Sequence, residues 1–568
     1  MKTVRIVRYV QMAALSLITT LSFAQTPAGW TNSAGGALND AGNWYGNTPA
    51  PGVEMKFYEN GPGNNLPPNG LTIPLTLNAN LTAKRWSCGW GWHVYDLNLS
   101  GFDLFLDDPD AWDSSPAWWL NTSSQNSTNT ITGTGTVWGA DFSVGAGANS
   151  SGLLDVYGSS TRMAFTGNVS DCYLNGVNVD SAPFNAGSWF RVRGGATVTN
   201  GAHSVLVGSS DKTHGGIYLS DTGTVWYCPP AVGGAFFGGY GSHTVSNEAI
   251  GDLVVSNGAK WSGATIYFGR ESGCIGNGKV TGAGSTLVAP GCRIWIGGKG
   301  KGLLIIENGG SGSTPEGTWI GRGNLGGAGF SASAVGEVRV VGANSSYSAG
   351  YWGALVGNQA TGLVYVSSGG SFIATGNGEG MVLGMGGEFS STNTAAYGLF
   401  SVSNANSLGT IRRVEIGRYG KGKVEVMDEA KLNVTGAGAD GYLKLRDGGN
   451  LTISDAEVTA NGDLTSEGAC TVRIELGARN HASNYLSVAN LNLSSGTPTL
   501  DVGVASDFSA EHMETIKLIG CTTGRTGFFA NRADQSTFTS GSYNFRITYS
   551  ANSVYLTVLR LGTVVTVR

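Results

Sequence analysis

A short apolar strand that ends in glycine recurs along most of this chain. Its copies lie about 30 residues apart on average, and each is followed by a small-residue loop and a second alternating strand, as in 303–311. A fixed period of this size indicates a repeat architecture. The copies end at Gly145, Gly208, Gly269, Gly297, Gly321, Gly357, Gly384 and Gly417, with weaker ones at Gly176 and Gly238. The next apolar–glycine end is Gly477, two periods beyond Gly417.

The repeat predicts a stack of β coils. Alternation sends one set of side chains inward and the other outward, and glycine supplies the positive φ that sharp corners need. One coil cannot bury its inner face alone, so coils stack around a continuous core. Such a core needs few charges, which agrees with 91 glycines and only 13% charged residues in 568. Because a propeller blade needs four strands in roughly 40–50 residues, we predict an all-β solenoid instead.

Two segments, 276–287 and 294–310, resemble the repeat associated with type V secretion and PEP-CTERM proteins. The resemblance is best over about 250–435 and weaker over 131–249. It implies a right-handed parallel β-helix, similar to an autotransporter passenger, in an exported bacterial protein. It brings no catalytic residues.

The first 24 residues predict a cleaved signal peptide. Lys2, Arg5 and Arg8 precede a short apolar run over 10–23, and small residues allow cleavage after Ala24. The run is shorter than the roughly 20 residues that a membrane-spanning helix needs. We therefore expect a protein that is secreted or held at the outer cell surface, with no transmembrane segment after cleavage. The net charge of −5 and the absence of a basic stripe argue against a nucleic-acid partner.

We predict three parts in the mature chain: a Trp-rich N-terminal cap and first coils over 25–130, β-helix repeats over 131–483, and a C-terminal β cap over 484–568. The cap would be antiparallel, with strands at 516–519, 543–549 and 554–559 and a turn at 550–553. Covering the open ends of a solenoid prevents its exposed strands from pairing with another molecule.

The tryptophans of the N-terminal part have two interpretations. Nine of the 15 in the chain fall between Trp30 and Trp138, and large aromatic side chains can close the end of the solenoid. Alternatively, some of the flat rings form a platform on which sugars stack. The partners would then be polysaccharide or cell-envelope components. The platform residues would be Trp86, Trp90, Trp92, Trp112, Trp118 and Trp119.

Candidate catalytic or metal-binding residues are few. Asp107, Asp108 and Asp110 form the one dense acidic cluster and flank a proline, which indicates a turn more than a calcium site. His203, His214 and His243 lie in neighbouring repeats, but no acidic partner repeats with them. They are expected to be exposed loop residues. We predict no catalytic residues, no metal and no cofactor.

A basic spot and seven cysteines complete the candidates. Arg412, Arg413 and Arg418 lie near Gly417 and offer a place for an anionic glycan. The cysteines lack the close spacing of a zinc site, and we expect small buried core residues. If any pair forms a disulfide, we expect Cys274 with Cys292.

These observations favour an exported, non-catalytic structural or adhesin-like protein of the bacterial surface. Parallel β-helices also include polysaccharide lyases and hydrolases, so an enzyme stays open as the first alternative. The second is a glycan-binding protein that uses the Trp-rich region.

Overall fold

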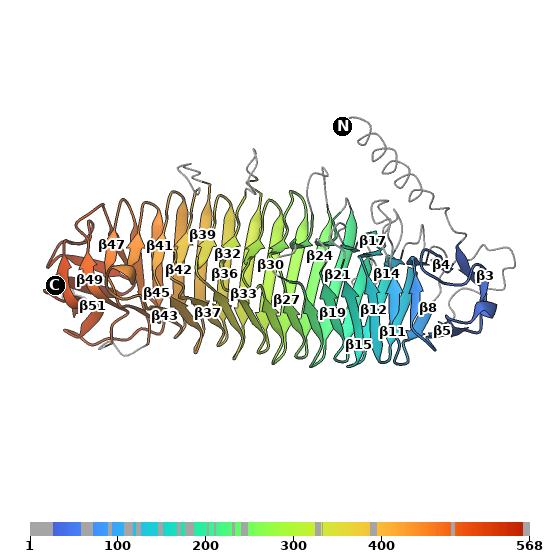
Figure 1. The fold of residues 1–568 in the computed structure, drawn as a ribbon. Coiled ribbons are helices and arrows are strands. Elements are labelled where there is room, and N and C mark those ends of the chain that lie inside the picture. Colours follow the sequence, from blue (N-terminus) through green and yellow to red (C-terminus); the bar gives the residue numbers. More distant parts are fainter. Residues whose placement is uncertain are drawn as a thin grey trace, which may run out of the picture.

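The computed structural model is a rod of stacked β coils (Figure 1). It describes residues 27–57, 72–88, 94–106, 118–120, 126–145, 151–166, 172–174, 176–177, 187–201, 204–209, 212–229, 233–239, 248–323, 331, 333–386, 395–478 and 483–559. Within this part of the chain, most coils contribute one strand to each of three parallel ladders, which we call the first, second and third faces in chain order. The coil formed by β27 (Ile275–Thr281), β28 (Thr286–Val288) and β29 (Arg293–Ile296) is typical.

Parallel pairing with the next coil runs along all three faces. The first face consists of β2 (Gly36–Ala37), β5 (Thr72–Thr76), β8 (Val94–Asn98), β11 (Asn126–Thr132), β14 (Ser151–Tyr157), β18 (Ser188–Arg193), β21 (Thr213–Ser220), β24 (Ile250–Ser256), β27, β30 (Lys301–Glu307), β33 (Val335–Val341), β36 (Thr361–Ser367), β39 (Tyr397–Ser403), β42 (Lys421–Met427), β45 (Gly449–Ser454), β48 (Thr471–Leu476) and β50 (Thr499–Val504). The short β17 (Gly176–Val177) pairs antiparallel with β21.

The second and third faces are built from shorter strands. The second consists of β6 (Leu81–Ala83), β9 (Leu104–Leu106), β12 (Gly135–Gly139), β15 (Thr161–Phe165), β19 (Thr197–Asn200), β22 (Val225–Tyr227), β25 (Lys260–Ser262), β28, β31 (Ser311–Thr314), β34 (Ser346–Ala349), β37 (Ser371–Ala374), β40 (Leu408–Ile411), β43 (Lys431–Val434) and β46 (Glu457–Ala460). The third consists of β1 (Ala28–Trp30), β4 (Glu54–Phe57), β7 (Arg85–Cys88), β10 (Trp118–Leu120), β13 (Phe142–Val144), β16 (Cys172–Leu174), β20 (Val205–Val207), β23 (Ala235–Phe237), β26 (Ile266–Phe268), β29, β32 (Gly317–Ile320), β35 (Ala354–Val356), β38 (Met381–Leu383), β41 (Val414–Ile416), β44 (Leu443–Leu445) and β47 (Leu464–Ser466).

The repeat glycines form the corner between the third face and the next first-face strand. All eight predicted ones have positive φ, for example 65° at Gly269 and 68° at Gly297. A Cβ on Gly269 would lie 2.0 Å from the carbonyl oxygen of Lys301 on the next coil. Real Cβ atoms do not approach an oxygen this closely, so the corner needs glycine for both its dihedral angle and its space.

A second glycine column faces this corner from the first face. Gly276 and Gly302 pair in register, and a Cβ on Gly302 would lie 2.2 Å from the amide nitrogen of Gly297. The two columns let the backbones of successive coils approach closely. The first-face column continues through Gly215, Gly251, Gly276, Gly302, Gly336, Gly362, Gly398, Gly422 and Gly449.

The core is one continuous hydrophobic column inside the coils. Trp226 and Trp261 stack on adjacent second-face strands, with ring centroids 5.3 Å apart, and Phe237 and Phe268 do so on the third face, also at 5.3 Å. The N-terminal end is aromatic, as predicted. There β3 (Trp44–Gly46) runs antiparallel to β1 after a short 3-10 helix, η1 (Ala41–Asn43), and the ring of Trp44 packs edge-on against that of Trp30 at 5.0 Å.

The C-terminal end is closed by an antiparallel sheet. β49 (Leu486–Asn492) pairs with both β46 and β47, which merges the second and third faces, and β51 (Thr515–Thr526) adds to it in parallel. β54 (Ser553–Leu559) then pairs antiparallel with β51 and with β53 (Tyr543–Tyr549), which also pairs with β52 (Thr537–Ser540). The predicted parallel β-helix and antiparallel cap are confirmed. Coil-like parallel pairing extends through β50, beyond the boundary predicted at residue 483.

Candidate functional sites

The predicted tryptophan platform is not supported by the two of its side chains that the structure describes. Trp86 and Trp118 are both 0% exposed, and their rings stack in the core at 4.7 Å with an interplanar angle of 5°. The Trp86 indole donates to Cys88 Sγ and Asn129 Oδ1, each at 3.1 Å. These rings fill the first coils and have no face for a sugar. Trp119 lies in β10, and Trp90, Trp92 and Trp112 lie outside the described residues.

One histidine has an acidic partner, against expectation. His214 Nε2 lies 2.7 Å from Asp252 Oδ2 on the adjacent first-face strand, and Asn277 on the strand after it donates to Asp252 Oδ1 at 2.8 Å. Trp189 packs edge-on against the histidine ring, 5.6 Å away between centroids. The carboxylate therefore holds one ring nitrogen of His214 in a fixed orientation, which is the arrangement of a positioned base. The acidic cluster Asp107, Asp108 and Asp110, together with His203 and His243, lies outside the described residues.

The predicted basic spot is neutralised. Arg412 Nη2 lies 3.0 Å from Asp440 Oδ2, and Arg413 Nη1 lies 3.6 Å from Asp440 Oδ1. Asp440 ends a 3-10 helix, η3 (Gly438–Asp440). Arg418 pairs with Glu379 at 2.9 Å and also with Glu415. The structure does not favour the binding of an anionic glycan here, because each guanidinium already has a carboxylate from its own or a neighbouring coil.

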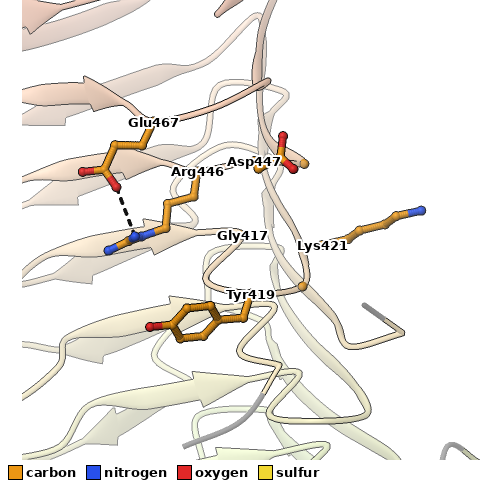
Figure 2. Close-up of a pocket in the computed structure, with 8 residues that line it drawn as sticks. Gly417, Tyr419, Lys421, Arg446, Asp447 and Glu467 are labelled. Carbon is orange, nitrogen blue, oxygen red and sulfur yellow. Dashed lines mark ion pairs between the residues drawn. The ribbon is translucent and has the colours of Figure 1, made fainter. Parts of the chain in front are cut away.

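This ionic network borders a pocket of about 450 Å³ at the corner after β41 and β44 (Figure 2). Arg446 lies between two carboxylates, 3.0 Å from Glu467 and in contact with Glu415. In Figure 2 the Tyr419 ring lies below Arg446, whereas the Lys421 side chain extends away from both. Asp447 also lines the pocket, where its Oδ1 accepts from the backbone of Ala469 at 3.1 Å.

Glu415 is the buried centre of the network, with a side chain only 2% exposed. Burial opposes its ionisation, but hydrogen bonds from Arg418 and the charges of Arg418 and Arg446 outweigh that effect and lower the pKa of the carboxyl. A carboxylate paired with two guanidiniums is a poor proton acceptor. The network therefore joins coils more readily than it performs acid–base chemistry.

A row of aromatic side chains on the outside of the third face was not predicted from the sequence. They occupy the middle position of the four successive copies that end at Gly238, Gly269, Gly297 and Gly321, and alternation directs this position outward. Phe236 and Tyr267 stack at 4.7 Å, Tyr267 and Trp295 lie 5.1 Å apart, and Trp295 and Trp319 lie 4.2 Å apart, all between ring centroids. We call these four residues the aromatic strip.

The strip continues as a small hydrophobic cluster separate from the core. It contains Trp319, Leu355, Val382 and Met385, against which Trp295 packs. On the next coil the same column reaches Glu415, where the charged network begins. The outside of the third face thus changes along the rod from aromatic to aliphatic to ionic.

The described thiols and carboxylates form neither a disulfide nor a metal site. The seven cysteines form no disulfide, and Cys292 alone among them is not fully buried. In the part of the chain that the structure describes, no group of three His, Cys, Asp or Glu side chains is arranged to hold a metal ion. Among the described residues, no helix has the length and apolar character needed to cross a bilayer.

The chain matches no protein family, and no curated protein matches it.

Proposed function

We propose that this protein is an exported, non-catalytic rod that acts as a structural or adhesin-like component of the bacterial surface. The observation that carries the proposal is the unbroken parallel pairing from the N-terminal coils to β50 on the first face. Such a stack is rigid along its axis and holds rows of outward side chains at the coil spacing of about 4.8 Å. A partner that binds along such a fixed row requires neither covalent chemistry nor a conformational change of the protein.

The distribution of charge supports the same function. Ionic side chains of the first face pair across coils, with Asp155 2.6 Å from Arg191 and 2.9 Å from Arg193, and Arg473 2.7 Å from Asp501. Pairs of this kind connect neighbouring coils through their outward side chains. The signal-like N-terminus and the resemblance of the repeats to type V secretion and PEP-CTERM sequences support export.

A polysaccharide-active enzyme is the second candidate, and His214 with Asp252 is the observation that favours it. A histidine held by a carboxylate could remove the proton next to a uronic carboxyl group. It would also need a group that neutralises that carboxyl, and on the adjoining strand Arg191 is already paired with Asp155.

One experiment separates the two. The purified protein is incubated with acidic and neutral polysaccharides, and new reducing ends and new unsaturated uronic ends are measured against heat-inactivated protein. Retention of the protein on beads that carry the same polysaccharides is measured in parallel. We expect retention without turnover. Turnover that disappears in H214A would refute the passive rod, and absence of both turnover and retention would refute an adhesive role.

A further inference from the structure

The pocket beside the ionic network has an accessible aromatic ring in its wall. Tyr419 lies two residues after the corner glycine Gly417 and is 51% exposed. The pocket that it lines, of about 450 Å³, falls within the roughly 300–1,000 Å³ of small-molecule sites. The backbone of Tyr419 has φ +71°, in the left-handed region that a residue with a bulky side chain seldom adopts.

The corner does not need a tyrosine at this position. Two other copies have a left-handed residue two places after the corner glycine, Gly323 at φ +69° and Gln359 at φ +75°. Glycine adopts this conformation without strain. In the described part of the chain, the ring of Tyr419 stacks on no other aromatic ring and belongs to neither hydrophobic cluster. A strained residue that adds nothing to the core points to a role in binding.

Charged side chains from the next two coils continue the row that Tyr419 begins. Tyr419, Arg446 and Glu467 follow the third-face strands β41, β44 and β47, which pair in succession. Figure 2 shows the tyrosine ring below the Arg446 guanidinium and the Glu467 carboxylate above it. Because neighbouring strands lie about 4.8 Å apart, one aromatic ring, one donor group and one acceptor group are placed along the rod in turn.

The charges that line the pocket balance one another. Two are cations, Lys421 and Arg446, and two are carboxylates, Asp447 and Glu467. The side chains of Arg446 and Glu467 form an ion pair at 3.0 Å, yet they are 33% and 43% exposed. A guanidinium has five N–H donors and a carboxylate about four lone-pair sites, so one ion pair leaves both able to bind a ligand. A surface with donors and acceptors but no net charge suits an uncharged ligand rich in hydroxyl groups.

We propose that this corner binds a neutral polysaccharide, with one pyranose ring stacked on Tyr419. The apolar C–H face of the sugar packs on the exposed face of the tyrosine ring. Its hydroxyl groups donate to Glu467 and accept from Arg446 through charge-assisted hydrogen bonds. The inference rests on the proposed adhesive function and names the ligand class and the place where it binds.

The test measures binding of the purified protein to laminarin, galactomannan, xyloglucan and dextran by isothermal titration calorimetry. We expect at least one of these neutral polysaccharides to bind, with an affinity that changes little as salt is added because the ligand carries no charge. Polygalacturonate, which is anionic, should bind more weakly. Y419A should weaken binding about tenfold, because the stacking partner of the sugar is lost. Y419F keeps the ring and should bind nearly as well as the unaltered protein.

Two further variants separate binding from stability. Y227A removes a tyrosine that is 40% exposed on the second face, away from the pocket, and should bind like the unaltered protein. Y419G removes the ring and relieves the left-handed strain. Its urea midpoint should therefore not fall, whereas its binding should be lost as in Y419A. A midpoint that falls in Y419G would assign the tyrosine to the fold and overturn the site.

Other results would also overturn the site: equal binding by Y419A and the unaltered protein, an equal loss in Y227A, equal binding of polygalacturonate, a steep fall of affinity with salt, or no binding to any of the four neutral polysaccharides. Retention on polysaccharide beads that persists in Y419A would refute this site and leave the adhesive rod standing.

Discussion

Replacing Gly269 with alanine should destabilise the rod by far more than an ordinary glycine substitution. The residue has φ +65°, and its new Cβ would lie 2.0 Å from the carbonyl oxygen of Lys301 and 2.4 Å from its carbon. A left-handed dihedral costs a residue with a Cβ roughly 1–2 kcal/mol. Displacing packed neighbours costs typically another 1–3 kcal/mol. The neighbour here is backbone that belongs to a ladder, so it cannot rotate away, and we expect a total loss of about 2–5 kcal/mol.

Gly291 provides the matched control. It has φ +71°, in the turn between β28 and β29, and nothing lies within 4 Å of its Cβ position. G291A therefore carries the dihedral cost of about 1–2 kcal/mol without the overlap. The gain from a less flexible unfolded chain is the same in both variants and cancels. The difference between them isolates the contact across coils, at about 1–3 kcal/mol.

Urea denaturation followed by far-ultraviolet circular dichroism measures the difference in unfolding midpoint. Because a repeat protein can unfold locally, hydrogen exchange of the peptides over 266–302 should accompany it. The amide of Gly297, which donates to Phe268 at 2.8 Å, should exchange faster in G269A. Equal midpoints for G269A and G291A would refute the argument that space, and not only the dihedral angle, selects glycine at this corner.

Three further outcomes are expected. W86A should lower the free energy of unfolding by about 3–5 kcal/mol, because it removes the ring between Phe57 and Trp118 and leaves a cavity in the core. The ring of Trp138 is 38% exposed, so W138A should lower the free energy of unfolding much less. Similar urea midpoints for the two variants would contradict the placement of Trp86 in the core. E415Q should cost about 1.5–3 kcal/mol at neutral pH, because Arg418 and Arg446 lose a charged hydrogen-bond acceptor but keep Glu379 and Glu467 as partners. The pKa of Glu415 is lowered in the fold from its usual 4.5. Its contribution to the free energy of unfolding is therefore present above about pH 4.5 and is lost as the pH falls below that value. E415Q should make stability fall less steeply with decreasing pH in the acid range, and an unchanged acid dependence would argue against the network. Burial raises the pKa of the Cys88 and Cys228 thiols to about 12, so iodoacetamide at pH 8 should modify both only after unfolding, and mass spectrometry that finds either labelled in the native protein would contradict their placement.

The fold could be predicted because its determinants are local. A glycine at each corner and alternation within each strand act over a few residues, and both can be read without knowing which coils are neighbours. The prediction fails where the corner after the third face no longer contains the repeated glycine. After Gly417 the third-face strands β44 and β47 continue without a terminal glycine, and Gly477 follows β48 on the first face. The expected next copy of the motif at Gly477 therefore belongs to a different face.

The candidate sites were harder to predict because they depend on register between coils of unequal length. His214 and Asp252 are 38 residues apart, and Glu415 and Arg446 are 31 apart, so no single spacing reveals such pairs. From the sequence, Trp86 and Trp118 fit either an aromatic cap or a sugar platform, and the structure places both side chains in the core. The aromatic strip did have a signal, since Tyr267, Trp295 and Trp319 all occupy the middle of the repeated triplet.

Each coil pairs only with the coil before it and the coil after it, so the length of the rod can change in evolution without a change of fold. Ile275 pairs with Lys301 and Gly276 with Gly302, so one coil occupies 26 residues between equivalent positions. Duplication in frame of the segment 275–300 would insert a complete layer, lengthen the rod by about 4.8 Å and add a further copy of Arg293 and Trp295 in line with the first. A gene that gains or loses such segments can change reach and the number of contacts together, without any new fold.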